Sequence, residues 1–261
     1  MNIQNHKFAF VVGLHASGTS TLSRMLKQHS QVSGFKNTGV PENEGQHLQT
    51  TIATAKSLGG PGMFAFHPDA VMDENHELAN DKTRDALLHE WQHQWDPRKE
   101  ILLEKSPPTI VRTRFFQSLF PQSHFICLTR HPIAVGYGTQ MWSETTTEDL
   151  LDHWLKAHEQ LSQDMESLDR VITLSYEGFL ANPLDTIHRV QEFLGIEKEP
   201  AQLPEVIEPN DVYFEMWREL SNNSKGEFHR FVAKHESSFR SFGYSLSDLN
   251  WAGDSRLNRK N

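Results

Sequence analysis

Apolar positions along the chain follow two alternating patterns, short runs rich in β-branched residues and longer stretches with apolar residues at helical spacing. The short runs, which predict buried strands, cover residues 8–12, 101–103, 124–128 and 171–174. The helical spacing, which predicts amphipathic helices, covers 21–29, 107–120, 150–168 and 183–194, and Pro132 opens a further helix. Strands that alternate with helices predict an α/β fold with three αβα layers around a central parallel sheet.

Two stretches interrupt this alternation, residues 31–68 and the polar part from 197 onward. A chain of 261 residues can form one substantial core, so we expect a single domain over 1–261. Its insertions are expected at about 31–96 and 197–261. Because irregular segments on a rigid sheet commonly carry recognition, these insertions are the expected side of substrate binding.

Composition excludes several classes of protein. The formal net charge of −9 and the lack of a dense basic run argue against nucleic-acid binding. No apolar stretch is long enough to span a bilayer, and no targeting segment is visible, which predicts a cytoplasmic protein. Cys127, the single cysteine, excludes an intramolecular disulfide. The oligomeric state stays open.

A phosphate-binding loop is predicted between the first strand and the first helix, with the sequence Gly13-Leu14-His15-Ala16-Ser17-Gly18-Thr19-Ser20. Small residues let successive backbone N–H groups point inward, and the helix N-terminus adds partial positive charge. The spacing of Gly13 and Gly18 is that of a P-loop, but Thr19 stands where nucleotide phosphatases and kinases carry lysine. That difference disfavours a phosphotransferase. A plain strand-to-helix turn is the alternative interpretation.

The loop resembles that of the sulfotransferase family, whose pattern P-[RK]-S-G-T-[TS] is matched by Ser17-Gly18-Thr19-Ser20, with His15 and Ala16 at the first two positions. The resemblance implies a P-loop-like sulfotransferase fold and 3′-phosphoadenosine 5′-phosphosulfate (PAPS) as the donor. It further implies that residues 15–20 bind the 5′ phosphosulfate.

Arg130-His131-Pro132 is similar to a second family pattern, R-[DNH]-P-x-x-[AV], in which the arginine binds the 3′ phosphate of the donor. Gly138 occupies the place of a serine that assists it, with Thr139 adjacent. Tyr176-Glu177, with Asn182-Pro183 and Phe193-Leu194-Gly195 after it, resembles the YE…P…FLG stretch of the family. This match implies that Tyr176 lies near the donor and that Glu177 is structural.

Glu104-Lys105-Ser106-Pro107 resembles the E-K-[ST]-P element of carbohydrate-type and tyrosyl-protein-type sulfotransferases. A fixed ammonium stabilises charge on a leaving oxygen, so Lys105 is the candidate catalytic cation. A base must also remove the proton of the acceptor hydroxyl. Residues 41–47 lie where tyrosyl-protein sulfotransferases place a glutamate, and Glu44 is the candidate, followed by Glu42 and His47. The implied reaction is direct in-line transfer, without a metal, to a carbohydrate, tyrosine or small-molecule hydroxyl.

Two alternatives stay open from the residues. His89-Glu90-Trp91-Gln92-His93 is a literal H-E-x-x-H, which on a helix presents two imidazoles to zinc and suits a metal-dependent hydrolase. A chain with 15 histidines produces such a match by chance, and histidines at the edge of the core are the competing interpretation. Ala16 and Gly138 motivate the other alternative, a non-catalytic nucleotide-binding protein on the same fold.

Overall fold

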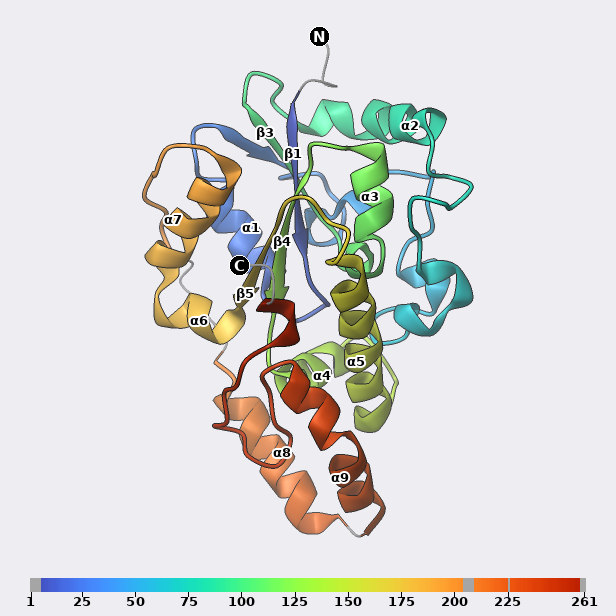
Figure 1. Cartoon of the computed structure of the whole chain (residues 1–261), viewed down its shortest axis with the longest axis vertical. Coiled ribbons are helices and arrows are strands. Elements are labelled where there is room, and N and C mark those ends of the chain that lie inside the picture. Colours follow the sequence, from blue (N-terminus) through green and yellow to red (C-terminus); the bar gives the residue numbers. More distant parts are fainter. Residues whose placement is uncertain (1–5, 204–208, 225, 259–261) are drawn as a thin grey trace.

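A five-stranded parallel sheet lies at the centre of the computed structural model, which describes residues 6–203, 209–224 and 226–258 (Figure 1). The spatial order is β2-β3-β1-β4-β5, and every neighbouring pair is parallel. The strands are β1 (Lys7–Val12), β2 (Val32–Gly34), β3 (Ile101–Lys105), β4 (His124–Thr129) and β5 (Val171–Ser175). The predicted parallel α/β sheet is confirmed.

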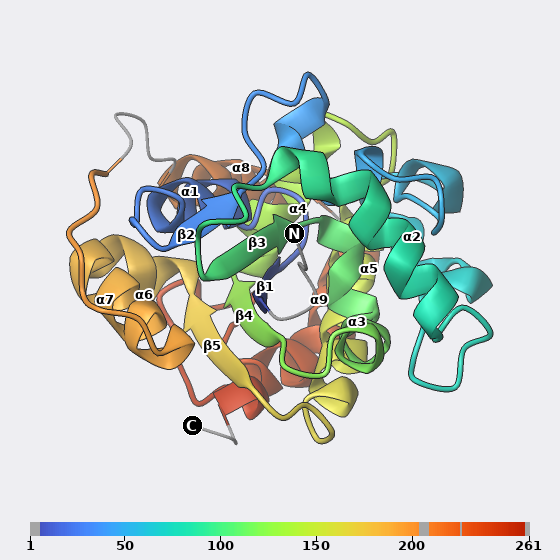
Figure 2. The same ribbon diagram turned by 90° about the horizontal axis from the view of Figure 1, so that it is seen from above.

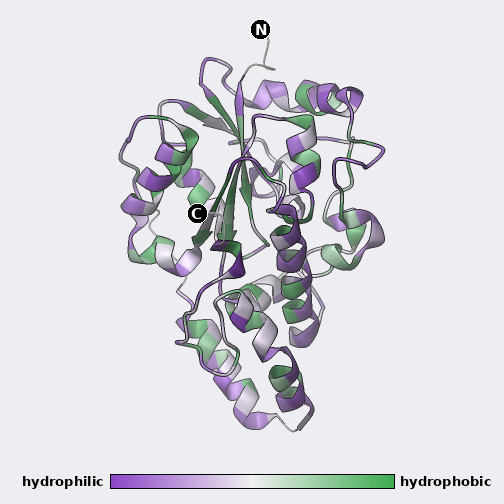
Figure 3. Ribbon diagram, in the orientation of Figure 1, coloured by the Kyte–Doolittle hydropathy of each residue, from purple (hydrophilic) through white to green (hydrophobic). Residues whose placement is uncertain are grey.

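Helices cover both faces of the sheet and complete the three predicted layers (Figure 2). On β1, Phe8, Phe10 and Val12 face one apolar core, while Ala9 and Val11 face the other. The first core includes residues of α2 (Asp81–Trp91), α3 (Thr113–Leu119) and α5 (Thr147–Asp164). The second includes residues of α1 (Thr19–Leu26), α6 (Tyr176–Ala181) and α7 (Pro183–Leu194). Figure 3 shows the resulting hydrophobic strands between mixed, outward-polar helices.

One sequence prediction differs from the structure around Arg112. The prediction of one continuous helix over 107–120 is wrong, because a 3-10 helix (Pro107–Val111) precedes α3 and Arg112 between them leaves the helical conformation, with a φ of −140° and a ψ of 19°. Its buried guanidinium donates to the carbonyls of Ala70 and Ala53 at 2.9 and 2.7 Å. The break therefore turns Arg112 toward two carbonyls of the long segment before β3 and attaches that segment to the core.

The stretches expected to be irregular contain regular elements. β2 lies within 31–68 and pairs with β3, Val32 opposite Ile101. α4 (Pro132–Gln140) follows β4, and the region from 197 onward contains α8 (Asp211–Asn223) and α9 (Gly226–Ser241), which extend beyond the sheet in Figure 1. The rings of Trp217 and Phe228 join these two helices, with centroids 4.8 Å apart. Within the described residues, no helix has the length and apolar character that crossing a membrane requires.

Phe10 tests the central packing. Its side chain is 1% exposed and its ring lies 4.9 Å from Phe116 and 5.5 Å from Phe125, centroid to centroid. Phe10→Ala is expected to lower the free energy of unfolding by about 3–5 kcal/mol, because it removes a buried ring and leaves a cavity. Urea denaturation measures the loss. Phe66→Ala, at a ring that is 44% exposed, is the control and should cost about 1 kcal/mol or less.

Candidate functional site

The predicted site residues come from the carboxyl ends of four neighbouring strands. The loop of residues 13–18 follows β1, Lys105 ends β3, Arg130 follows β4, and Tyr176 follows β5. Parallel pairing places these ends at one edge of the sheet, with Val11 opposite Lys105 and Thr129 opposite Ser175. This edge is where open α/β sheets bind their ligands.

The loop after β1 has the geometry of an anion cradle. Ser17 turns back on Leu14, whose carbonyl accepts from the Ser17 hydroxyl at 2.6 Å and from its N–H at 3.2 Å. Gly18 then begins α1 with a φ of 92° and no side-chain cap. The first N–H groups of a helix have no intrahelical acceptor, and here those of Gly18, Thr19 and Ser20 are in that position. Such a helix terminus favours a phosphate or sulfate group.

Gly18 is required by its surroundings as well as by its φ. A Cβ at this position would lie 2.4 Å from the ring of Tyr176. Tyr176 therefore packs directly on the loop, and its predicted place near the donor stays a prediction. The ring also stacks with the Arg130 guanidinium, whose central carbon lies 4.2 Å from the ring centroid.

Arg130, which follows β4, is buried and its side chain hydrogen-bonds to the loop after β1. Its Nη1 donates to the Ala16 carbonyl at 2.8 Å and its Nε donates to Asn210 Oδ1 at 2.9 Å. Asn210 in turn donates at 2.7 Å to Glu177, which also accepts the His131 N–H at 3.0 Å. Glu177 thus orients this corner of the site, and Asn210 is a contact that the sequence analysis missed.

Ala16 and Gly138, two positions at which the chain departs from the family patterns, lie next to each other in the structure. A Cβ added to Gly138 in α4 would lie 2.7 Å from the Ala16 Cβ. Ala16 itself has a φ of 60°, a left-handed conformation that costs a non-glycine residue free energy. α4 therefore approaches the loop too closely for a side chain at 138, and Thr139 beside it is buried.

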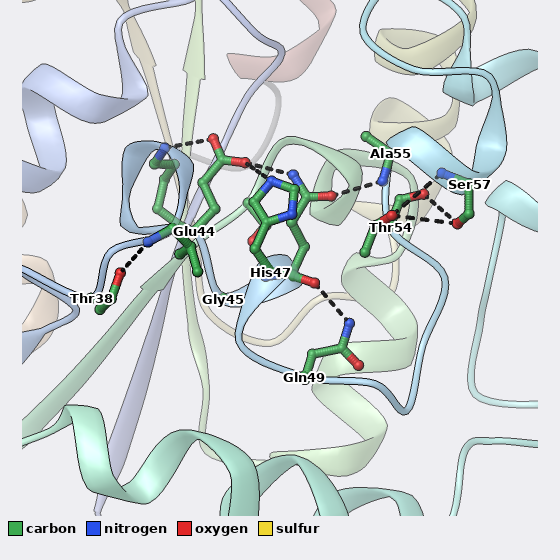
Figure 4. A network of polar contacts seen from close by, with 12 residues as sticks. Thr38, Glu44, Gly45, His47, Gln49, Thr54, Ala55 and Ser57 are labelled. Atoms are coloured by element: carbon green, nitrogen blue, oxygen red, sulfur yellow. Dashed lines mark hydrogen bonds and ion pairs between the residues drawn. The ribbon is translucent and has the colours of Figure 1, made fainter.

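Glu44, His47 and Lys105, which the sequence analysis names as candidate catalytic residues, lie close together. Lys105 Nζ donates to Glu44 Oε1 at 2.8 Å, and the two side chains are 5% and 7% exposed. The second carboxylate oxygen accepts from Gln46 Nε2 and lies 3.7 Å from His47 Nε2. In Figure 4 the Glu44 carboxylate and the His47 ring face one another. Glu42, by contrast, is exposed.

Glu104 and Ser106 fix the backbone beside Glu44. The Gly45 N–H donates to Glu104 Oε1 at 3.0 Å, and the Gln46 N–H donates to Ser106 Oγ at 2.9 Å. Burial, and secondarily the Glu44 charge, raise the pKa of Glu104 to about 7. Its Oε2 has no hydrogen-bond partner among the described residues. Glu104 was present in the E-K-[ST]-P match, but only the structure shows that it holds Gly45.

The charges of Glu44 and Lys105 also act on His15 in the loop after β1. Burial lowers its pKa to about 4, the Glu44 charge raises it in part, and the Lys105 charge lowers it further. The ring is therefore neutral at pH 7. Its Nδ1 is buried without a hydrogen-bond partner in the part of the chain that the structure describes.

The H-E-x-x-H pentapeptide does not form a metal cluster with its neighbours. α2 ends at Trp91, and His89 and His93 are exposed, so their predicted place at the edge of the core is wrong. Glu90 accepts hydrogen bonds from Thr50 and Thr51. Within residues 6–203, 209–224 and 226–258, no group of three His, Cys, Asp or Glu side chains is arranged to hold a metal ion.

The first strand of the parallel αβα sheet leads through a glycine loop into a helix, which makes this loop a candidate anion-binding site at the carboxyl edge of the sheet. The family model described as the sulfotransferase family matches residues 9–200. The chain therefore belongs to the sulfotransferase family.

Individual relatives are distant. Protein-tyrosine sulfotransferase 2 of Gallus gallus is 24% identical over 196 residues, which cover 72% of this chain and 50% of that protein. The chain thus spans about half the length of this curated relative. The crystal structure of a sulfotransferase from Alicyclobacillus acidocaldarius covers 90% of this chain and 96% of its own, with a TM-score of 0.53 and 16% identity. The crystal structure of sulfotransferase STF9 from Mycobacterium avium has a TM-score of 0.54 and 13% identity, and the match covers 96% of this chain and 79% of that one. These similarities show the αβα sulfotransferase fold.

Gly18→Ala tests the loop geometry. The substitution is expected to lower the free energy of unfolding by about 2–4 kcal/mol, because it adds strain at positive φ and a clash with Tyr176. Gly39→Ala is the matched control, since Gly39 also has a positive φ, 80°, but its Cβ would meet nothing within 4 Å. Urea denaturation should give a clearly smaller loss for Gly39→Ala. Equal losses would show that Tyr176 does not confine Gly18.

Glu104→Gln tests the raised pKa. A carboxyl whose pKa is about 7 when folded and 4.5 as a model value stabilises the fold fully below pH 4.5 and loses this contribution as the pH rises through 7. Glutamine has no such dependence. The stability of the variant relative to the wild-type protein should therefore rise by about 2 to 3 kcal/mol between pH 4.5 and 7 and then level off. Urea titrations across this range measure it, and a constant difference would contradict the prediction.

Proposed function

We propose that the protein transfers the sulfuryl group of PAPS to an acceptor hydroxyl by direct in-line displacement. The observation that carries the proposal is the convergence of the anion cradle, Arg130 and the Lys105–Glu44 pair at one edge of the sheet. In the transfer, the acceptor oxygen forms a bond to sulfur as the bond from sulfur to the bridging oxygen breaks. The electron pair leaves with adenosine 3′,5′-bisphosphate, and the acceptor proton goes to the base.

The donor fits the groups present at the loop. Uncapped N–H groups at the start of α1 suit the 5′ phosphosulfate, and residues 15–20 line this position. Arg130, after the end of β4, is the proposed partner of the 3′ phosphate, and Gly138 permits the close approach of α4 to Ala16. Tyr176, which packs on Gly18 and on Arg130, is proposed to lie near the donor and to hold these two groups in place.

Lys105 and Glu44 are the proposed catalytic pair. The ammonium of Lys105 stabilises the negative charge that develops on the bridging oxygen, and in a buried site this interaction is stronger than in water. Glu44 accepts the proton of the acceptor hydroxyl, with His47 at its second oxygen. Acceptor recognition is assigned to the segments 31–96 and 197–261, the expected insertions of a single domain.

The contact of Ala16 with the Gly138 position favours a second candidate, a nucleotide-binding relative that turns nothing over. Ala16 contributes no charge where the family pattern has a cation. In the proposed enzyme Lys105 replaces that charge. Transfer from labelled PAPS in an acceptor screen separates the two functions, because only the enzyme yields a labelled sulfate ester.

Titration calorimetry with adenosine 3′,5′-bisphosphate, in buffer with a chelator, tests the nucleotide site. The wild-type protein is expected to bind with a dissociation constant in the micromolar range. Arg130→Ala should weaken binding about 100-fold, because charge-assisted hydrogen bonds to a phosphate are lost. Arg98→Ala, which removes an arginine with an 81% exposed side chain, is the control and should leave the affinity unchanged. Absence of binding to the wild-type protein would overturn the proposed function.

A further inference from the structure

The two proposed catalytic groups, the Lys105 ammonium and the Glu44 carboxylate, form an ion pair with each other in the structure. Lys105 Nζ covers Oε1 of Glu44 at 2.8 Å, although the reaction requires the ammonium on the donor and the carboxylate on the acceptor. We propose that donor binding unmasks the base: Lys105 exchanges Glu44 for the 5′ side of the nucleotide, and Glu44 Oε1 then becomes free to accept the acceptor proton. This inference rests on the proposed function and adds an order to it, donor before acceptor.

The surroundings of Glu44 allow such an exchange without collapse of the base. Its other oxygen, Oε2, keeps the hydrogen bond from Gln46 Nε2 when Lys105 leaves. The backbone on either side is fixed separately, because Gly45 donates to Glu104 and Gln46 donates to Ser106. The carboxylate therefore stays in place, and the oxygen that Lys105 releases is the one that becomes available.

Lys105 is suited to change partners. Its backbone is held in β3, opposite Val11, two residues before the phosphate loop begins. Its four-carbon stem is flexible, so the ammonium can turn while the strand stays fixed. The Lys105 charge already acts on His15 within the loop, where it lowers the pKa of the ring. The Lys105 ammonium thus interacts electrostatically both with Glu44 and with the loop that contains His15.

Burial makes this an exchange and not a simple separation. Both side chains are largely removed from water, and an unpaired buried charge is far more costly than a paired one. A phosphate or sulfate oxygen offers Lys105 an equivalent charge-assisted hydrogen bond. Without the donor, the carboxylate remains paired and the acceptor hydroxyl has no free base.

Competition for Lys105 predicts that removal of the Glu44 charge strengthens nucleotide binding. The probes are adenosine 3′,5′-bisphosphate, which carries the 5′ phosphate, and adenosine 3′-monophosphate, which lacks it. By titration calorimetry, Glu44→Gln should bind the bisphosphate about tenfold more tightly than the wild-type protein does. Its affinity for the 3′-monophosphate should be unchanged, because that nucleotide does not reach Lys105.

Lys105→Met, combined with Glu44→Gln, completes a double-mutant cycle. In this background Glu44→Gln should no longer strengthen binding of the bisphosphate, because the competed cation is absent. Glu42→Gln is the matched control, since it removes an exposed carboxylate two residues away and should change neither affinity. If Lys105→Met alone fails to fold, the doubly substituted protein, which has no unpaired buried charge, is compared with the wild-type protein and should bind the bisphosphate no more tightly than it.

The outcomes separate this inference from the function on which it rests. Failure of the wild-type protein to bind the bisphosphate overturns both. Binding by the wild-type protein without a gain in Glu44→Gln overturns the exchange and leaves the proposed nucleotide site intact. An equal gain for both nucleotides, or a gain that persists without Lys105, shows general repulsion by Glu44 and likewise overturns the exchange.

Discussion

The parallel pairing of β1 with β3 sets the positions on which the candidate site depends. Val11 lies opposite Lys105, and the glycine loop of residues 13–18 begins two residues after Val11. A slip of one residue would move every side chain of β3 to the other face of the sheet, so this register also fixes which core Leu102 and Leu103 enter. The apolar packing that specifies the register therefore also places the ammonium beside the loop.

The same strand end attaches the long segment that carries Glu44. Glu104 and Ser106 accept the backbone N–H groups of Gly45 and Gln46, and Lys105 between them pairs with the Glu44 side chain. A Cβ at Gly45 would lie 2.5 Å from Glu104 Oε1, so a glycine is needed for this approach. The segment is thus positioned by polar contacts at its functional end and by Arg112 farther along.

The sequence was most informative where one physical signal dominated. Buried strands read as apolar runs, and the helix predicted over 183–194 has the bounds of α7, which ends in a left-handed cap at Gly195 with a φ of 69°. β2 was missed because three residues, Val32-Ser33-Gly34, are too short for a periodic pattern, and pairing with β3 alone defines them. The break at Arg112 depends on two distant carbonyls and has no local signal. The site residues could be named from the family patterns, but not the Glu44–Lys105 pair, whose members are 61 positions apart in sequence. Their catalytic roles stay predictions.

Charge balance among Glu44, Glu104 and Lys105 explains how an acidic protein can offer a site to the proposed anionic donor. The formal net charge is −9, so long-range attraction does not favour a phosphate ligand. Below its pKa of about 7, Glu104 binds a proton and adds no negative charge beside Lys105, which leaves the ammonium balanced by Glu44 alone. His15 remains neutral at pH 7 because burial lowers its pKa. Local attraction for an anion at this edge therefore depends on how far one ammonium is released from one carboxylate, in addition to the backbone N–H groups of α1 and the guanidinium of Arg130.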